Sequence, residues 1–300
     1  MGTHRTRWFT TTEGLRLAAS ALGSPGAPCV LLLHGGGQTR HAWSKAIDQV
    51  AAAGYYAVGL DLRGHGESDW SPQGAYDPNE MARDVAEVLQ EIAEPTVLVG
   101  ASMGGQAALR ALANCATENA RAVILVDIVP SPARHGVRKV TDFMQRHLDG
   151  FASLEEVAAA VASYNPRRER PSDIEGLKKN VRLRADGRYY WHWDPRLLDI
   201  GNTDAKLDKM DYDTWAAAQN LTLPCLLLRG GDSDVVDIEA METFRQRIGH
   251  AEIREVPRAG HMVAGDQNDA FNTQLLEFLT RVMPPVKDTT QSSSALSTPS

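Results

Sequence analysis

The sequence contains no apolar run that approaches the roughly 20 residues needed to cross a bilayer, so no membrane-spanning segment is expected. Its opening stretch, MGTHRTRWFTTTEG, carries basic residues with no apolar segment behind them, and it therefore does not match a secretory signal peptide. These two absences predict a protein that has no membrane partner.

Cysteine is scarce, and basic residues are not in excess. The 3 cysteines, Cys29, Cys115 and Cys225, form no close pair, which argues against a disulfide scaffold and a zinc site and predicts a cytoplasmic location. The formal net charge of −7 argues against a nucleic-acid partner, because proteins that bind nucleic acid present a basic surface. With 43% hydrophobic and 23% charged residues, the composition is that of an ordinary globular protein.

Short apolar runs alternate along the chain with longer stretches of helical periodicity. CVLLLHGGG (29–37) and AVILVDIVP (122–130) are such runs, and NEMARDVAEVLQEIA (79–93) has the helical pattern. The alternation predicts an α/β fold with a mostly parallel β-sheet of about eight strands and helices on both faces. It stops after Pro130 and resumes at 224–236, which predicts a helical lid inserted in the core.

The predicted boundaries follow these changes of pattern. Residues 1–130 and 216–283 form the core, and residues 131–215 form the lid. The last stretch, PPVKDTTQSSSALSTPS, is rich in Ser, Thr and Pro with almost no apolar content, so residues 284–300 are predicted to be a disordered tail.

A serine lies at the corner between an apolar strand and a small-residue helix in VLVGASMGGQAAL (97–109). GASMG fits the G-x-S-x-G nucleophile elbow, in which a sharp turn exposes the serine hydroxyl and the following helix directs its amides at a developing oxyanion. The alternative is a serine that only caps the helix. Gly100 and Gly104 on either side of Ser102 favour the catalytic interpretation, because strand and helix must approach closely there.

A serine hydroxyl needs a base, and the base needs a carboxylate to orient it. In α/β proteins with this elbow, the chain order is Ser, then Asp or Glu, then His. LRGGDSDVV places Asp232 and Asp234 just beyond a strand, and VPRAGHMVAG places His261 in a loop after the next strand. Loops at the carboxyl ends of strands carry the sites of open α/β sheets.

Taken together, these motifs resemble the α/β-hydrolase superfamily, in its lidded branch with a serine nucleophile. LLLHGGG resembles the oxyanion loop, DLRGHGES the loop after the following strand, and RAGHM the histidine loop. The resemblance covers residues 15–130 and 220–282 and is strongest to cofactor-free haloperoxidase-like esterases and epoxide-hydrolase-like proteins. Epoxide hydrolases and haloalkane dehalogenases carry Asp at the elbow, so Ser102 argues against those two activities.

The resemblance implies a role for each matching position. Ser102 is the nucleophile, His261 the general base and acid, and Asp234 the orienting acid, because G-x-x-D maps onto residues 231–234. Asp232 and Asp127 remain as alternatives for the acid, Asp127 because some members carry it after the preceding strand. The backbone amides of Gly36 and Met103 are the oxyanion donors, with Gly37 as an alternative to Gly36.

Other side chains near these motifs have structural interpretations beside functional ones. His34 and His65 lie in glycine loops without a metal-binding motif, and we expect them to hydrogen-bond the loop backbones. The run DGRYYWHWDPRL (186–197) is aromatic in a chain with only 6% aromatic residues. Tyr189, Trp191 and Trp193 are therefore candidates for an apolar substrate pocket, although they could equally fix the lid to the core.

The combined prediction is a serine hydrolase that cleaves a carboxylic ester or lactone through an acyl-enzyme, with no metal or organic cofactor and a small-molecule partner. The alternatives are a perhydrolase of haloperoxidase type, a C–C bond hydrolase, and a small-molecule receptor on a hydrolase scaffold. C–C hydrolysis would use positive groups of the lid, for which Arg182, Arg184 and Arg188 are available. Either a monomer or a homodimer is compatible with the sequence.

Overall fold

The computed structural model describes residues 3–115, 117–164, 174–263 and 268–285. Eight strands form one sheet: β1 (Arg5–Thr10), β2 (Arg16–Leu22), β3 (Cys29–Leu33), β4 (Tyr56–Leu60), β5 (Thr96–Ala101), β6 (Ala120–Val126), β9 (Cys225–Gly230) and β10 (Glu252–Val256). Their order in the sheet is β1-β2-β4-β3-β5-β6-β9-β10. The pairs β1–β2 and β2–β4 are antiparallel and the other pairs are parallel, so the predicted mostly parallel sheet is confirmed.

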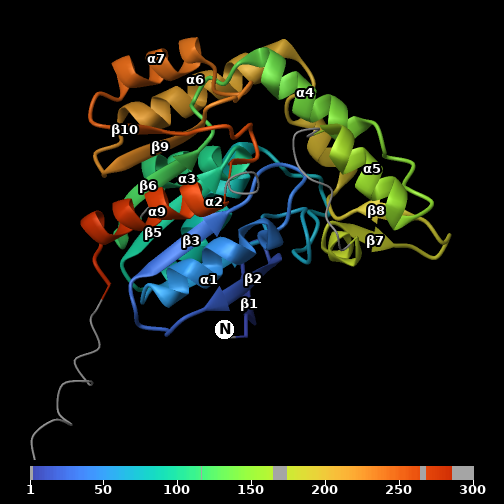
Figure 1. The fold of residues 1–300 in the computed structure, drawn as a ribbon, viewed down its shortest axis with the longest axis horizontal. Coiled ribbons are helices and arrows are strands. Elements are labelled where there is room, and N and C mark those ends of the chain that lie inside the picture. The colour runs from blue at the N-terminus through green and yellow to red at the C-terminus, as the bar shows by residue number, and fades with distance from the viewer. Residues whose placement is uncertain (1–2, 116, 165–173, 264–267, 286–300) are drawn as a thin grey trace, which may run out of the picture.

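Helices cover both faces of this sheet (Figure 1). The helices of the core are α1 (Ser44–Ala52), α2 (Pro78–Glu91), α3 (Met103–Asn114), α7 (Ile238–Arg247) and α9 (Asn268–Val282). Because successive strand residues point to opposite faces, the apolar residues of β3 divide between two buried clusters. Val30 and Leu32 pack with α1 and α9, whereas Leu31 and Leu33 pack with α2 and α3. Strands buried on both faces explain the uninterrupted apolar runs of the sequence.

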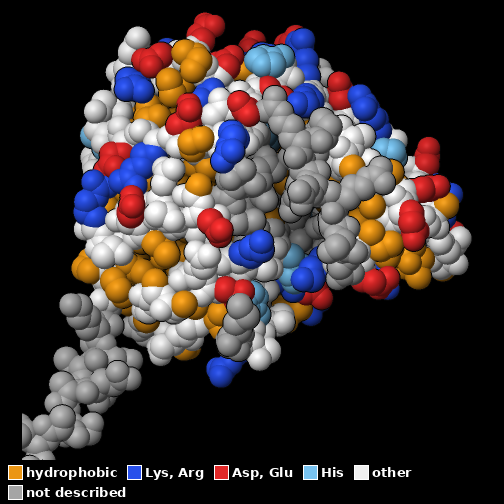
Figure 2. All heavy atoms as spheres, in the orientation of Figure 1, with side chains coloured by type: hydrophobic (Ala, Val, Ile, Leu, Met, Phe, Trp, Pro, Cys, Tyr) orange, Lys and Arg blue, Asp and Glu red, His pale blue; other side chains and the backbone are white. Residues whose placement is uncertain are grey.

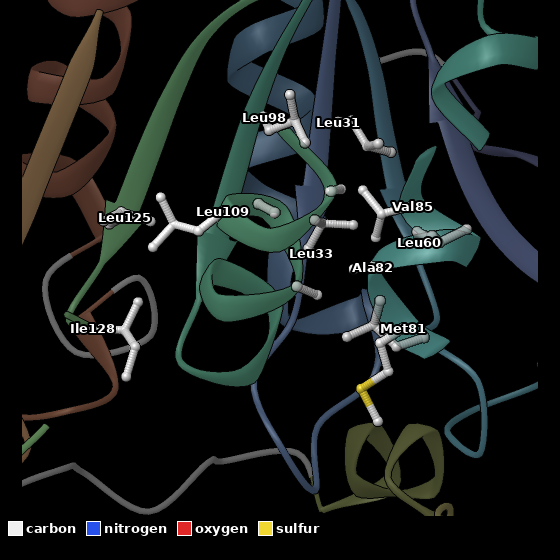
Figure 3. Packing of buried hydrophobic residues seen from close by; sticks show 14 of the residues in the cluster. Leu31, Leu33, Leu60, Met81, Ala82, Val85, Leu98, Leu109, Leu125 and Ile128 are labelled. Atoms are coloured by element: carbon white, nitrogen blue, oxygen red, sulfur yellow. The ribbon is translucent and has the colours of Figure 1, made fainter. Parts of the chain in front are cut away.

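Figure 3 shows the second of these clusters, where Leu31, Leu33 and Leu98 of the strands meet Met81 and Val85 of α2. The start of α2 is fixed locally. Asp77 caps the helix by accepting a hydrogen bond from the amide of Asn79, and Pro78 occupies the first turn. The cluster therefore places α2 and α3 against the same face of the sheet.

The chain between β6 and β9 forms the segment expected to be a lid. It contains α4 (Arg134–Gln145), α5 (Leu154–Tyr164), β7 (Val181–Leu183), β8 (Tyr189–Trp191) and α6 (Asp204–Gln219). The described residues also include three short 3-10 helices: η1 (Arg40–Trp43) in the core, and η2 (Glu175–Lys179) and η3 (Pro195–Asp199) in this segment. The segment is thus not purely helical, since β7 and β8 form an antiparallel pair.

Residues 286–300, most of the predicted tail, lie outside the described residues. Within the described ranges, none of the helices has the length and apolar character to cross a bilayer. On the face drawn in Figure 2, acidic and basic side chains are interspersed.

Candidate active site

Ser102 lies at the turn between β5 and α3, in a backbone conformation that L-residues rarely adopt. Its φ is 46° and its ψ is −118°. This geometry is costly for a residue with a Cβ, and it occurs where a surrounding structure holds the turn in place. The amide of Ser102 donates to the carbonyl of Val126 at the end of β6, 3.3 Å away. The turn is therefore anchored to the neighbouring strand.

Glycines on both sides of Ser102 permit the close approach of strand and helix. A Cβ at Gly100 would lie 2.5 Å from the Cα of Gly105, and one at Gly104 would lie 2.5 Å from the carbonyl oxygen of Leu33. Neither space accepts a side chain. Gly105, which the motif does not specify, is similarly restricted, because its Cβ would lie 2.5 Å from Cγ2 of Ile128.

His261 lies beyond β10, and its imidazole contacts a carboxylate at the end of β6. Nδ1 of His261 is 2.8 Å from Oδ2 of Asp127. The His261 side chain is 10% exposed, and that of Asp127 is fully buried. A buried carboxylate at this distance fixes the orientation of the ring and the position of its Nδ1 proton.

Asp127 is itself held by two further donors. Its Oδ1 accepts from the amide of Gly230, 2.8 Å away, and its Oδ2 accepts from the hydroxyl of Ser233, 2.5 Å away. The Ser233 hydroxyl also accepts from the amides of Val235 and Val236. The sequence analysis did not identify Ser233. A serine that follows a strand in a loop that turns into a helix was the only available signal.

The expected pairing of His261 with Asp234 is wrong for this structure. Asp234 forms an ion pair with Lys139 of α4, and its side chain remains 29% exposed. A Cβ at Gly136 would lie 2.1 Å from the carbonyl oxygen of Asp234, so α4 packs directly on the backbone there. The carboxylate that contacts Nδ1 of His261 belongs to Asp127, which was one of the two alternatives to Asp234.

The glycine loop after β3 lies beside the same site. Gly37 donates its amide hydrogen to Nε2 of His65 at 3.2 Å, which leaves Gly36 as the better candidate for an oxyanion donor. Met103 is the first residue of α3, where a helix amide has no partner within the helix. Gly36 and Met103 both border the cavity that contains Ser102 and His261.

His34 and His65 hold the loop backbones, as the sequence analysis expected. Nε2 of His34 accepts from the amide of Leu62, and its Nδ1 donates to the carbonyl oxygen of Gly35. Burial lowers the pKa of both imidazoles, that of His65 to about 3 with a further contribution from neighbouring His34. Both rings are therefore neutral, and His65 keeps the lone pair on Nε2 that accepts from Gly37.

The cavity at Ser102 measures about 160 Å³ and is mostly apolar. Its walls come from α2, α3, α4, α6 and η3 and the loops around them. Four methionines border it: Met81, Met103, Met144 and Met210. Its polar lining residues other than Ser102 and His261 are Gln106, Arg134, Thr141 and Asp211. Such a lining suits an apolar group with a polar function at one point.

The candidate aromatic side chains of the run 186–197 do not border this cavity. Tyr189, Trp191 and Trp193 are absent from its lining. Trp191 packs edge-on against Phe151, with ring centroids 4.9 Å apart, and Trp193 is 3% exposed. Trp191 therefore packs inside the segment, whereas Trp193 forms an isolated β-bridge with His65 and joins the segment to the core.

The arginines considered for C–C hydrolysis are also engaged elsewhere. Arg182 donates to the carbonyl oxygen of Gly66, Arg184 stacks on Tyr190, and Arg188 donates to the carbonyl oxygen of Gly150. None of the three borders the cavity at Ser102. Among the described residues, no group of three or more His, Cys, Asp or Glu side chains is arranged to hold a metal.

Comparison with known proteins identifies the family of this chain. A model of the alpha/beta hydrolase family matches residues 30–274. The chain is 33% identical over 255 residues to the esterase Rv0045c of Mycobacterium tuberculosis, an alignment that covers 82% of this chain and 80% of that protein. It is 28% identical to the sn-1-specific diacylglycerol lipase ABHD11 of Mus musculus, over 84% of this chain and 81% of that one.

Solved structures share the fold of this chain. A crystal structure of E-2-(acetamidomethylene)succinate hydrolase superposes with a TM-score of 0.81 at 20% identity, over 92% of this chain and 99% of that one. A structure of the M. tuberculosis esterase Rv0045c gives a TM-score of 0.74 at 28% identity, over 93% of each chain. With the elbow serine, the histidine loop and the sheet order described above, the family match establishes that this chain is a member of the alpha/beta hydrolase family.

Proposed function

We propose that the chain is a serine carboxylesterase that works through an acyl-enzyme, with Ser102, His261 and Asp127 as its catalytic triad. The observation that carries the proposal is the 2.8 Å contact between Nδ1 of His261 and the buried carboxylate of Asp127. His261 shares its cavity with Ser102, whose backbone has the strained elbow conformation. The name of the esterase relative supports ester hydrolysis over C–C cleavage.

In the proposed reaction, His261 takes the proton of Ser102 as Oγ attacks the carbonyl carbon of the ester. The amides of Gly36 and Met103 stabilise the oxyanion, and loss of one such donor typically costs about 3 to 4 kcal/mol. The C–O bond breaks as His261 returns the proton to the leaving alcohol. A water molecule, deprotonated by His261, then releases the acid and restores Ser102.

The cavity defines the substrate class in outline. The acyl group stays on Ser102 through both steps, whereas the alcohol leaves between them, so we assign the cavity to the acyl group. Its volume of about 160 Å³ is close to that of an engineered apolar cavity, about 150 Å³, that binds benzene. The proposed substrates are therefore esters of small, mainly apolar acids.

Steady-state hydrolysis of 4-nitrophenyl esters with acyl chains of two to ten carbons tests this function. We expect an optimum at short to medium chains and a loss of turnover of about 10,000-fold or more in Ser102→Ala. Ser44→Ala, which removes a half-buried hydroxyl at the start of α1 that donates to the carbonyl oxygen of His41, is the matched control. Full turnover in a folded Ser102→Ala variant would exclude the mechanism.

A further inference from the structure

The first turns of α3 present one side of the helix to the cavity at Ser102. Ser102, Met103, Gln106 and Ala107 all border the cavity, and positions four apart lie on the same side of a helix. The backbone amide of Gln106 donates to the carbonyl oxygen of Ser102 at 3.1 Å, so the two residues are one turn apart. Because side chains of a helix lean toward its N-terminus, that of Gln106 leans toward the turn that contains the nucleophile.

The carboxamide of Gln106 is open to this cavity. It has no hydrogen-bond partner in the part of the chain that the structure describes. Gln106 is 8% exposed, and neither Oε1 nor Nε2 is among the fully enclosed side-chain atoms that lack a partner, so both atoms can be reached. A second cavity, which runs along α4 to the start of α7, does not include Gln106. A free donor and a free acceptor therefore lie side by side in the wall of the cavity at Ser102.

The next polar side chain on this side of α3 is engaged elsewhere. Arg110, one turn beyond Gln106, donates to Asn79 and Thr214. It also donates to the carbonyl oxygen of Met210. A largely buried amide that pairs with none of its neighbours is destabilising, so its place one turn from the nucleophile indicates a partner on the substrate.

We infer that Gln106 binds a primary carboxamide on the acyl group of the substrate. The inference rests on the proposed function and names a substrate class for it. A carboxamide can form two hydrogen bonds with Gln106, in which its N–H donates to Oε1 and its oxygen accepts from Nε2. A ketone or a carboxylate offers acceptors only and leaves Oε1 without a donor. A site that forms hydrogen bonds with a substrate group discriminates strongly against analogues that lack the group.

The spacing of Ser102 and Gln106 sets the length of the acyl group. One helical turn rises about 5.4 Å, and two or three methylene groups between two carbonyl carbons span roughly 4 to 5 Å. Succinamate and glutaramate, which have two and three methylene groups, therefore match the distance from the nucleophile to the amide. The cavity of about 160 Å³ has room for acyl groups of this size.

The charges of the lining disfavour a carboxylate in place of the carboxamide. Arg134 already faces the carboxylates of Asp208 and Asp211, and Asp211 itself borders the cavity. A carboxylate on the substrate would add a negative charge near Asp211 and would face Oε1 of Gln106. Repulsion from both offsets the hydrogen bond that it could accept from Nε2.

Ethyl esters of four matched acids test this inference, with the released acid titrated at constant pH and corrected for spontaneous hydrolysis. Their acyl groups differ only at the far end, which is a carboxamide (succinamate), a methyl ketone (levulinate), a carboxylate (the succinate half-ester) or an isopropyl group (4-methylpentanoate). These four ends have equal numbers of heavy atoms. A second set is one methylene group longer. At the better length, we expect kcat/KM of the carboxamide ester to exceed that of each of the others by about tenfold or more.

Variants assign this preference to Gln106. Gln106→Met keeps the length of the side chain and removes both polar atoms. The ratio of carboxamide to isopropyl ester should therefore fall to about one, while hydrolysis of the isopropyl ester continues. Gln106→Leu should have the same effect and covers the case in which Gln106→Met does not fold. Gln246→Met is the control, because it makes the same change at an exposed position of α7 that does not border the cavity.

The outcomes are distinguishable. An unchanged ratio in both Gln106 variants, or no carboxamide preference in the parent, overturns the inference and leaves the esterase intact. A levulinate ester that reacts as well as the succinamate ester shows that an acceptor is sufficient, which overturns the choice of a carboxamide, as does a preference for the half-ester. Hydrolysis of 4-nitrophenyl esters without hydrolysis of any ester of the two sets also overturns the inference. If the folded parent hydrolyses no ester of either kind, the proposed function fails, and this inference fails with it.

Discussion

The imidazole of His261 and the carboxylate of Asp127 come from positions 134 residues apart, yet Nδ1 and Oδ2 lie 2.8 Å from each other. Asp127 follows β6 directly and has a φ of 49°, which turns its side chain from the strand toward the histidine loop. Asp234 lies in the loop after β9, the next strand of the sheet, and faces α4 instead. The two aspartates therefore have different predicted roles.

Asparagine substitutions separate these roles. Asp127→Asn should lower kcat by about 1,000- to 10,000-fold, because the amide cannot stabilise the imidazolium and favours the wrong tautomer. Asp234→Asn, which removes one exposed ion pair, should change kcat by less than about twofold. Steady-state kinetics on one short-chain ester measures both. The reverse order of effects would restore Asp234 as the acid and contradict the geometry.

Ser233 is expected to act through Asp127. Its hydroxyl lies 2.5 Å from Oδ2, the same oxygen that contacts His261. Ser233→Ala removes this donor and frees the carboxylate to rotate, so kcat should fall about tenfold with little change in KM. The control is Ser71→Ala, because Ser71 is another buried serine that bonds the amide of Ala75 and is not among the partners of Asp127.

If the two serine variants lose similar thermal stability but only Ser233→Ala loses kcat, the effect belongs to the position of Asp127. If both keep kcat, or both lose it in proportion to the folded fraction, Ser233 has only a structural role.

Gly104 is expected to tolerate no side chain. A Cβ there would lie 2.5 Å from the carbonyl oxygen of Leu33 and 2.7 Å from that of His34, and backbone atoms cannot move aside as a side chain does. Gly104→Ala should therefore lower the free energy of unfolding by roughly 2 kcal/mol or more and displace the oxyanion loop. Gly176→Ala is the control, since nothing lies within 4 Å of its added Cβ. Chemical denaturation of both variants measures the difference.

The sequence was sufficient for the parts of the site that local chemistry determines. Ser102 between Gly100 and Gly104 was identifiable because the elbow requires small residues at those positions, and the sheet because its strands are apolar on both faces. The choice between Asp127 and Asp234 was not, because both follow strands. It depends on α4, whose Lys139 binds Asp234 and whose Gly136 packs on the Asp234 backbone.

The same limit applies to the cavity lining. An aromatic run such as the one at Trp191 and Trp193 has the same appearance whether it lines a cavity or packs a core. The difference is made by Phe143 and Phe151, distant in sequence, against which Trp191 packs. Gln106, in contrast, lies within the elbow stretch itself, yet only the fold reveals that it borders the cavity and that its amide has no partner among the described residues.

His65 is predicted to make the fold sensitive to acid. Burial lowers its pKa from 6.5 to about 3 in the folded chain, so the folded state binds fewer protons than the unfolded state below pH 6.5. Proton uptake by His65 in the unfolded state therefore leaves the free energy of unfolding unchanged above pH 6.5 and lowers it as the pH falls toward 3. The decrease is about 2 kcal/mol between pH 7 and pH 5. His65→Gln keeps an acceptor for the amide of Gly37 but does not titrate. Its free energy of unfolding, measured in urea at both pH values, should fall by about 2 kcal/mol less than that of the parent over this interval. Equal losses in the two proteins would show that protonation of His65 does not oppose folding.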